Sequence, residues 1–134
     1  MSTRSQTLVG ILTLLLLLLL WAGTAAACSC VPLTAKEAQG LADHVFTGRV
    51  VLVEDYGARE VRAELRVYQV WKGDVEKIQR VITLDDEAMC GFTFLQGQEY
   101  LIFATGGEVD GVRTHYCAGN QDLFLADPWL EELG

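Results

Sequence analysis

Residues 61–71 read VRAELRVYQVW and predict a strand that coils strongly. Apolar side chains occupy every second position as far as Val67, and charged side chains stand between them, which is typical of a half-buried strand. Beyond Val67 the alternation changes phase, because Tyr68, Val70 and Trp71 follow. A β-bulge or strong coiling accounts for such a shift. The stretch therefore favours a curved sheet.

The same reasoning predicts four further strands, rich in β-branched and apolar residues, at residues 45–53, 77–84, 99–105 and 112–117. Glycine-containing turns separate them, at Gly57, Gly73, Gly97 and Gly106. Five short, curved strands in a small chain are typical of a closed barrel. We therefore predict an all-β barrel.

Two short helices are expected to flank the strands. Thr34 and Glu37 have the spacing of a capping box, which predicts a helix over residues 36–42. Asp127 followed by Pro128 is typical of a cap and a first helical residue, and predicts a helix that ends at Leu133.

The first 27 residues have the order of a secretory signal peptide. Arg4 lies in a short polar region, residues 8–22 are apolar, and residues 23–27 are small. Cleavage is expected after Ala27. Removing 27 of the 134 residues leaves 107, which we predict to form a single domain over residues 28–134. The predicted location is extracellular, or the periplasm or cell envelope of a bacterium.

Two alternatives to cleavage and secretion stay open. An uncleaved anchor would have to span the membrane with the 15 apolar residues 8–22, although a spanning helix needs about twenty. A lipoprotein would carry lipid on Cys28, which directly follows small residues. Ala25, however, occupies the position where lipoprotein signals usually have leucine.

Charge and motifs exclude several function classes. The chain has 18 acidic and 10 basic residues, and since Arg4 lies in the leader, the mature part has a net charge of −9. Nucleic acid is therefore not an expected partner. Sequence motifs of nucleophilic, phosphate-binding and zinc-protease sites are missing, so we expect no enzyme and no cofactor. We interpret Asp85-Asp86-Glu87 as a solvated turn and His44 and His115 as ordinary strand residues.

Four cysteines remain in the mature chain, Cys28, Cys30, Cys90 and Cys117, and export makes disulfides their expected state. A bridge between Cys28 and Cys30 would close a strained loop around one residue. Two pairings remain, Cys28–Cys90 with Cys30–Cys117, or the crossed arrangement. A zinc site is disfavoured because the Cys-x-Cys spacing is too short for common structural zinc sites.

Four blocks of sequence stand out in the mature chain: CSCVP at residues 28–32, ADHVFTGRV at 42–50, VYQVWKG at 67–73, and Cys90-Gly91 followed by GQEYLI at 97–102. In this order they resemble blocks of the tissue inhibitors of metalloproteinases, within the netrin-like superfamily, and Cys117 falls at the next cysteine of the family. Several blocks in order are more specific than any single one.

This resemblance implies a five-stranded barrel of the oligonucleotide/oligosaccharide-binding (OB) type with the pairing Cys28–Cys90 and Cys30–Cys117. The chain also departs from the family. It has no third disulfide in this region, because no cysteine lies between Cys30 and Cys90. The cysteine-rich C-terminal subdomain of the animal inhibitors has no counterpart either.

The function implied by the resemblance is inhibition of secreted zinc endopeptidases by a monomer. The free amine and the carbonyl of Cys28 would chelate the catalytic zinc of the protease, and Ser29 would enter its specificity pocket. The implied contact residues are Cys28, Ser29, Cys30, Val31, Pro32, Ala88 and Met89. The alternative functions are a non-inhibitory extracellular binding module and a lipid-anchored envelope protein.

Overall fold

Five strands close into a barrel in the computed structural model, which describes residues 3–21 and 28–134. They are β1 (His44–Asp55), β2 (Glu60–Lys72), β3 (Ile78–Leu84), β4 (Glu99–Glu108) and β5 (Gly111–Arg113). Their order is β1-β2-β3-β5-β4, and β4 closes the barrel by pairing with β1. Strands β3 and β5 are parallel, whereas the other pairs of the barrel are antiparallel. A two-residue strand, β6 (Gln121–Asp122), adds to β4.

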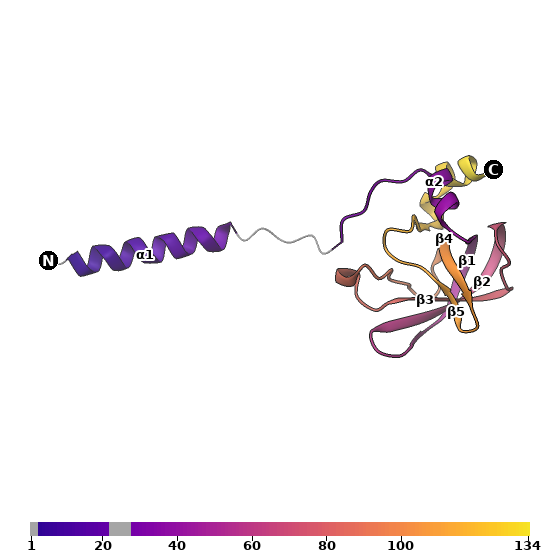
Figure 1. Cartoon of the computed structure of the whole chain (residues 1–134), viewed down its shortest axis with the longest axis horizontal. Coiled ribbons are helices and arrows are strands. Elements are labelled where there is room, and N and C mark those ends of the chain that lie inside the picture. The colour runs from indigo at the N-terminus through magenta and orange to yellow at the C-terminus, as the bar shows by residue number, and fades with distance from the viewer. Residues whose placement is uncertain (1–2, 22–27) are drawn as a thin grey trace.

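Helices accompany the barrel, so the fold is mixed α/β rather than purely all-β. The described residues contain three α-helices, α1 (Thr3–Leu20), α2 (Ala35–Leu41) and α3 (Asp127–Leu133). They also contain two short 3-10 helices, η1 (Glu87–Met89) and η2 (Leu123–Leu125). Figure 1 shows α2 close to the C-terminal helix, on one side of the barrel.

Strand β2 contains the irregularity that its sequence predicts. Its pairing with β1 skips Tyr68 and Trp71, whose neighbours on either side lie opposite consecutive residues of β1. A third shift falls on β1 itself, at Val51. Each extra residue bends the strand and increases its twist. These bulges let β1 and β2 stay paired while they curve around the barrel.

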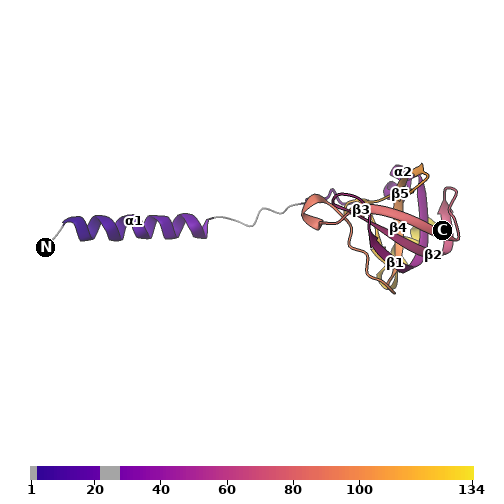
Figure 2. The same ribbon diagram turned by 90° about the horizontal axis from the view of Figure 1, so that it is seen from below.

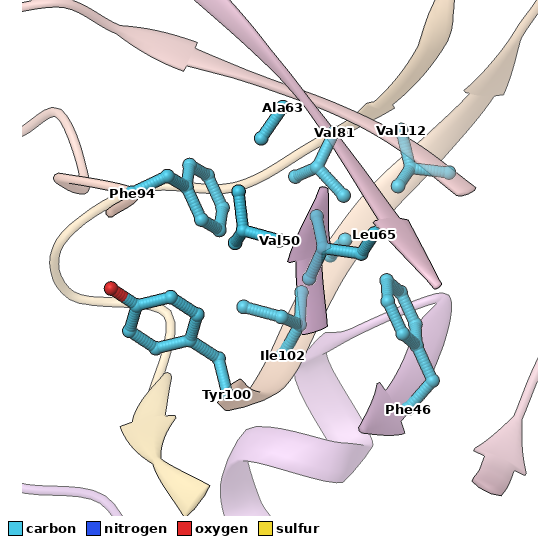
Figure 3. Close-up of a cluster of buried hydrophobic side chains, with 10 residues drawn as sticks. Phe46, Val50, Ala63, Leu65, Val81, Phe94, Tyr100, Ile102 and Val112 are labelled. Carbon is cyan, nitrogen blue, oxygen red and sulfur yellow. The ribbon is translucent and has the colours of Figure 1, made fainter. Parts of the chain in front are cut away.

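The barrel interior is filled by apolar side chains from all five strands and from the segment before β4. Three rings, those of Phe92, Phe94 and Tyr100, meet edge to face at centroid distances of 5.0–5.7 Å. Burial raises the pKa of Tyr100, whose hydroxyl accepts a hydrogen bond from the Leu95 amide (3.1 Å). Figure 3 shows Phe94 and Tyr100 among the core residues Phe46, Val50, Ala63, Leu65, Val81, Ile102 and Val112.

A second apolar cluster joins helices α2 and α3 to the outside of the barrel, through side chains that include Val45, Leu101 and Phe103. The predicted capping box is present at the start of α2, and its hydrogen bonds from the backbone and side chain of Thr34 lower the pKa of Glu37. Glu132 of α3 accepts hydrogen bonds from two further amides of the first turn of α2, at 3.3 and 3.2 Å. The start of α2 is thereby fixed, and with it the end of the segment that precedes it.

Several predicted boundaries differ from the observed ones, among them those of the last barrel strand and of the two helices. The strand expected over residues 112–117 ends at Arg113, because the side chain of Asn120 accepts the hydrogen bond of the Phe103 amide and donates to Thr114 Oγ1, both at 2.8 Å. Helix α3 begins at Asp127 rather than being capped by it. Ala126 is both the C-cap of η2 and the N-cap of α3. Because alanine has no side-chain oxygen, α3 has no side-chain cap. The helix predicted over 36–42 lies one residue earlier.

Helix α1 is long and apolar enough to cross a membrane, a test that a signal sequence near the N-terminus also passes. It is consistent with the predicted signal peptide, and the two disulfides indicate a secretory compartment. The predicted cleavage site at residues 25–27 lies outside the described residues.

Truncation of a core side chain tests the barrel. Leu65 is 0% exposed, whereas Leu52 on the neighbouring strand is 39% exposed. We expect Leu65→Ala to lower the free energy of unfolding by about 2–5 kcal/mol, because it removes buried methyl groups and leaves a cavity. Leu52→Ala should lower it by less than about 1 kcal/mol. Urea unfolding of both variants measures the difference, and equal losses would contradict the assigned core.

Candidate functional site

The segment over residues 28–33 is largely exposed. It forms neither helix nor strand, and the side chain of Val31 is 79% exposed. Pro32 lacks an amide hydrogen and fixes its own φ, which favours an extended or turn conformation around it. The capping box at Thr34 ends the segment. Because no strand pairs with these residues, other contacts must hold them in place.

The first such contact is the disulfide between Cys28 and Cys90, whose Cα atoms are 5.5 Å apart. Cys90 ends the short helix η1 in a left-handed conformation, with φ 68°. Asp86 caps the same helix through a hydrogen bond from the Ala88 amide to its carboxylate (2.8 Å). Gly91 follows, and a Cβ atom at this position would collide with the carbonyl oxygen of Leu84. This close approach requires glycine and fixes the direction in which Cys90 leaves the barrel.

The second disulfide joins Cys30 to Cys117, with Cα atoms 5.2 Å apart. The parallel pairing of β3 and β5 explains how the two bridges come together. Parallel neighbours end at the same edge of a sheet, so the segments that follow them, residues 85–90 and 114–117, leave the barrel at the same end. The Tyr116 amide donates a hydrogen bond to the Cys90 carbonyl (2.8 Å) and joins these two segments directly.

We call the resulting surface the disulfide ridge, defined by residues 28–33, 85–90 and 115–117. Three large apolar side chains on it are exposed: Val31 by 79%, Tyr116 by 50% and Met89 by 38%. Each of them is the neighbour in sequence of a bridged cysteine. A groove of about 260 Å³ runs beside the segment, lined in part by Pro32, Tyr116 and Trp129.

The structure brings most of the predicted contact residues together. Ser29 is exposed between the two bridges, and Ala88 and Met89 lie on the turn that Cys90 ties to Cys28. Sequence reasoning missed Tyr116, although its position next to Cys117 was a signal, since a residue beside a bridged cysteine shares its location. Tyr116 was placed within a strand that in the structure ends at Arg113.

The predicted turn at residues 85–87 has a structural role. Asp86 caps η1, and Glu87 accepts a hydrogen bond from the Thr93 hydroxyl (2.7 Å). Within residues 3–21 and 28–134 no group of three or more His, Cys, Asp or Glu side chains could hold a metal ion.

The two histidines lie apart. His44 is the first residue of β1, and its Nε2 lies 2.5 Å from the Gly106 carbonyl oxygen. His115 lies beyond the end of β5, so the prediction that it is a strand residue is wrong. Its Nδ1 accepts a hydrogen bond from the Cys117 amide (3.2 Å) and helps to shape the turn before the bridge.

Comparison of the chain with models of known protein families gave no match, and comparison with curated proteins gave none either. Any proposal for the function of the protein therefore depends on the residue pattern and on the geometry of the disulfide ridge.

The two bridges should supply much of the stability of the domain. They close loops with sequence separations of 62 and 87 residues. Loops of this length are worth about 4 kcal/mol each in the chain-entropy description, so reduction of both should lower the free energy of unfolding by several kcal/mol. Urea unfolding with and without a reductant measures this loss. Peptide mapping of the oxidised protein is the control, and a Cys90–Cys117 peptide would contradict the pairing.

Proposed function

We propose that the protein is a secreted inhibitor of zinc endopeptidases that acts through its disulfide ridge. The observation that carries this proposal is the position of residues 28–30, which two disulfides hold in a largely exposed segment beside the turn of Met89. A segment that is fixed before it binds loses little conformational entropy on binding. Such a segment suits insertion into an active-site cleft.

The chemistry of the mature N-terminus supplies a zinc ligand. Catalytic zinc has three protein ligands and one open position, which is occupied by the water that performs hydrolysis. After cleavage at Ala27, the α-amino nitrogen and the carbonyl oxygen of Cys28 form a five-membered chelate ring with this zinc and displace the water. The amine binds in its neutral form, and because α-amino groups have a reference pKa of about 7.7, its deprotonation at physiological pH costs little.

The remaining ridge residues have separate roles in the contact. Ser29 enters the specificity pocket next to the zinc, and residues 30–32 continue along the cleft. Ala88 and Met89 line the other side of Cys28. The exposed side chains of Val31, Met89 and Tyr116 supply apolar contact area. Apolar groups at the centre of an interface, surrounded by polar groups, are typical of protein complexes.

The barrel supports the same assignment. We assign it to the OB type, as in the netrin-like superfamily, because five strongly bent strands close through β1 and β4 and both bridges have the pairing that the resemblance implies. The lack of a third disulfide in this region is a departure from the family. The capping of α2 by Thr34 and Glu132 anchors the end of the N-terminal segment instead.

The alternatives have a direct test. Lipid on Cys28 would occupy its amine and its thiol, and would remove both the chelating nitrogen and the bridge to Cys90. Mass analysis of the mature protein distinguishes the cases. An unmodified N-terminus at Cys28 with two disulfides agrees with the proposal, whereas a lipid adduct contradicts it.

Extension of the mature N-terminus by one alanine tests the chelation. The extra residue moves the amine away from the zinc and leaves the barrel and bridges intact. We expect the inhibition constant to rise at least about a hundredfold, because a lost zinc ligand is worth several kcal/mol and each 1.4 kcal/mol is about tenfold. Ser29→Gly, which removes only a side-chain contact, should weaken inhibition less.

The measurement is the inhibition of a panel of zinc endopeptidases by the authentic, extended and Ser29→Gly proteins, with disulfide mapping as the control for folding. Equal potency of the authentic and extended forms would contradict chelation. If neither form inhibited any member of the panel, the inhibitor assignment itself would be wrong, and a non-inhibitory binding module would be favoured.

A further inference from the structure

The first turn of α2 is capped partly from the far end of the chain. An α-helix leaves its first four backbone amides without a partner inside the helix. The capping box satisfies two of them, because the Thr34 amide donates to the Glu37 carboxylate (2.8 Å) and the Glu37 amide donates to Thr34 Oγ1 (3.2 Å). The amides of Ala35 and Lys36 donate to separate carboxylate oxygens of Glu132, at 3.3 and 3.2 Å. Helix α3 therefore completes a cap that the local sequence leaves half satisfied.

Helix α2 is attached along the rest of its length as well. Lys72 of β2 donates a hydrogen bond from Nζ to the Gln39 carbonyl (2.8 Å), near the C-terminal end of the helix. A carboxylate at the N-terminus and an ammonium group at the C-terminus both complement the helix dipole. Between them Ala35 and Ala38 are buried in the second apolar cluster, and Figures 1 and 2 both show α2 at the outside of the barrel. Once its first turn is capped, α2 gives residues 28–33 a fixed end.

The two halves of this segment are held in different ways. Ser29 lies between two bridged cysteines. Val31 and Pro32 lie between Cys30 and the start of α2, and no hydrogen bond involves Val31, Pro32 or Leu33 in the part of the chain that the structure describes. Leu33 packs, partly buried, against the second apolar cluster. The position of Val31 and Pro32 therefore depends on the anchor at α2, whereas that of Ser29 does not.

We propose that Glu132 is a positioning residue for the contact of Val31 and Pro32 with the endopeptidase. The inference rests on the proposed inhibitory function and gives the C-terminal helix a part in it. Glu132 acts through the cap of α2 and does not itself touch the endopeptidase. A segment that is ordered before it binds loses less conformational entropy on binding. Loss of the cap thus lowers affinity through Val31 and Pro32, and leaves the Cys28 chelate and Ser29 in place.

Three variants of α3 test the proposal. Glu132→Ala removes both acceptor oxygens, and Glu132→Gln keeps the length of the side chain and one oxygen, so it should restore much of the cap. Glu131→Ala is the matched control, because it removes the same charge from the neighbouring position. Glu131 is exposed and makes no hydrogen bond or ion pair with any residue that the structure describes. Disulfide mapping of each variant is the control for folding.

The first measurement is the NMR order parameter of the Val31 amide in the free mature protein. We expect it to fall from about 0.85, the value of rigid backbone, to about 0.7 or less in Glu132→Ala. The Ser29 amide should stay near 0.85 because the two bridges hold it. Glu131→Ala should leave both values unchanged, and Glu132→Gln should recover most of the loss at Val31.

The second measurement is the inhibition constant for the endopeptidase that the authentic protein inhibits most tightly. We expect Glu132→Ala to raise it about three- to tenfold, as for the loss of a helix cap, and Glu131→Ala to raise it less than about twofold. Val31→Ala should weaken inhibition less in the Glu132→Ala protein than in the authentic one, because a mobile Val31 has already lost part of its contribution. Ser29→Gly should have the same effect in both. Such a cycle isolates the coupling of two residues, which a role in stability alone would not produce.

Failure of the inference can be told apart from failure of the proposed function. An unchanged order parameter of Val31 in Glu132→Ala, or an equal effect of Val31→Ala in both proteins, would overturn the inference alone. An equal loss in Glu131→Ala would mean that charge matters rather than the cap. If Glu132→Ala did not form both disulfides, Glu132→Asp, which is too short to reach both amides, would replace it under the same criteria. If the authentic protein inhibited no endopeptidase of the panel, the proposed function would be wrong and this inference with it.

Discussion

The proposed site depends on two covalent bonds that attach an unpaired N-terminal segment to the barrel. Residues 28–33 belong to no helix or strand of the fold. The bridges Cys28–Cys90 and Cys30–Cys117 hold them at two cysteines that are separated only by Ser29. The bridges close loops with sequence separations of 62 and 87 residues. In the chain-entropy description each closure stabilises the folded state by about 4 kcal/mol. That is a large fraction of the 5–15 kcal/mol that stabilises a typical domain. The same bonds thus serve stability and the geometry of the ridge.

The barrel is the support on which the bridges act. Parallel pairing of β3 and β5 delivers Cys90 and Cys117 to the same end of the sheet, and the hydrogen bond from Tyr116 to Cys90 joins their segments. The close contact at Gly91 sets the direction of the first segment. On the other side, α2 and α3 fix the residue at which the N-terminal segment ends. Most ridge residues are exposed, yet each segment is attached at defined points.

Local patterns in the sequence predicted most elements, because their physical causes are local. The phase change after Val67 indicated the bulges, and the spacing of Thr34 and Glu37 indicated the start of a helix. The end of β5 was not predictable in this way, since it depends on Asn120, which contacts Phe103 and Thr114 only in the folded chain. Tyr116 was missed because the predicted strand included it, although its position beside Cys117 was a signal. The residues alone left two disulfide pairings open, and only the family resemblance chose between them.

The central claim is that the oxidised protein holds residues 29–31 rigid before any partner binds. The most direct test is the backbone order parameter of these three amides, measured by NMR relaxation on the free mature protein. The account predicts values of about 0.85, as in rigid backbone, despite their position near the N-terminus. Values below about 0.6 with both disulfides intact would mean a flexible segment and would contradict the account.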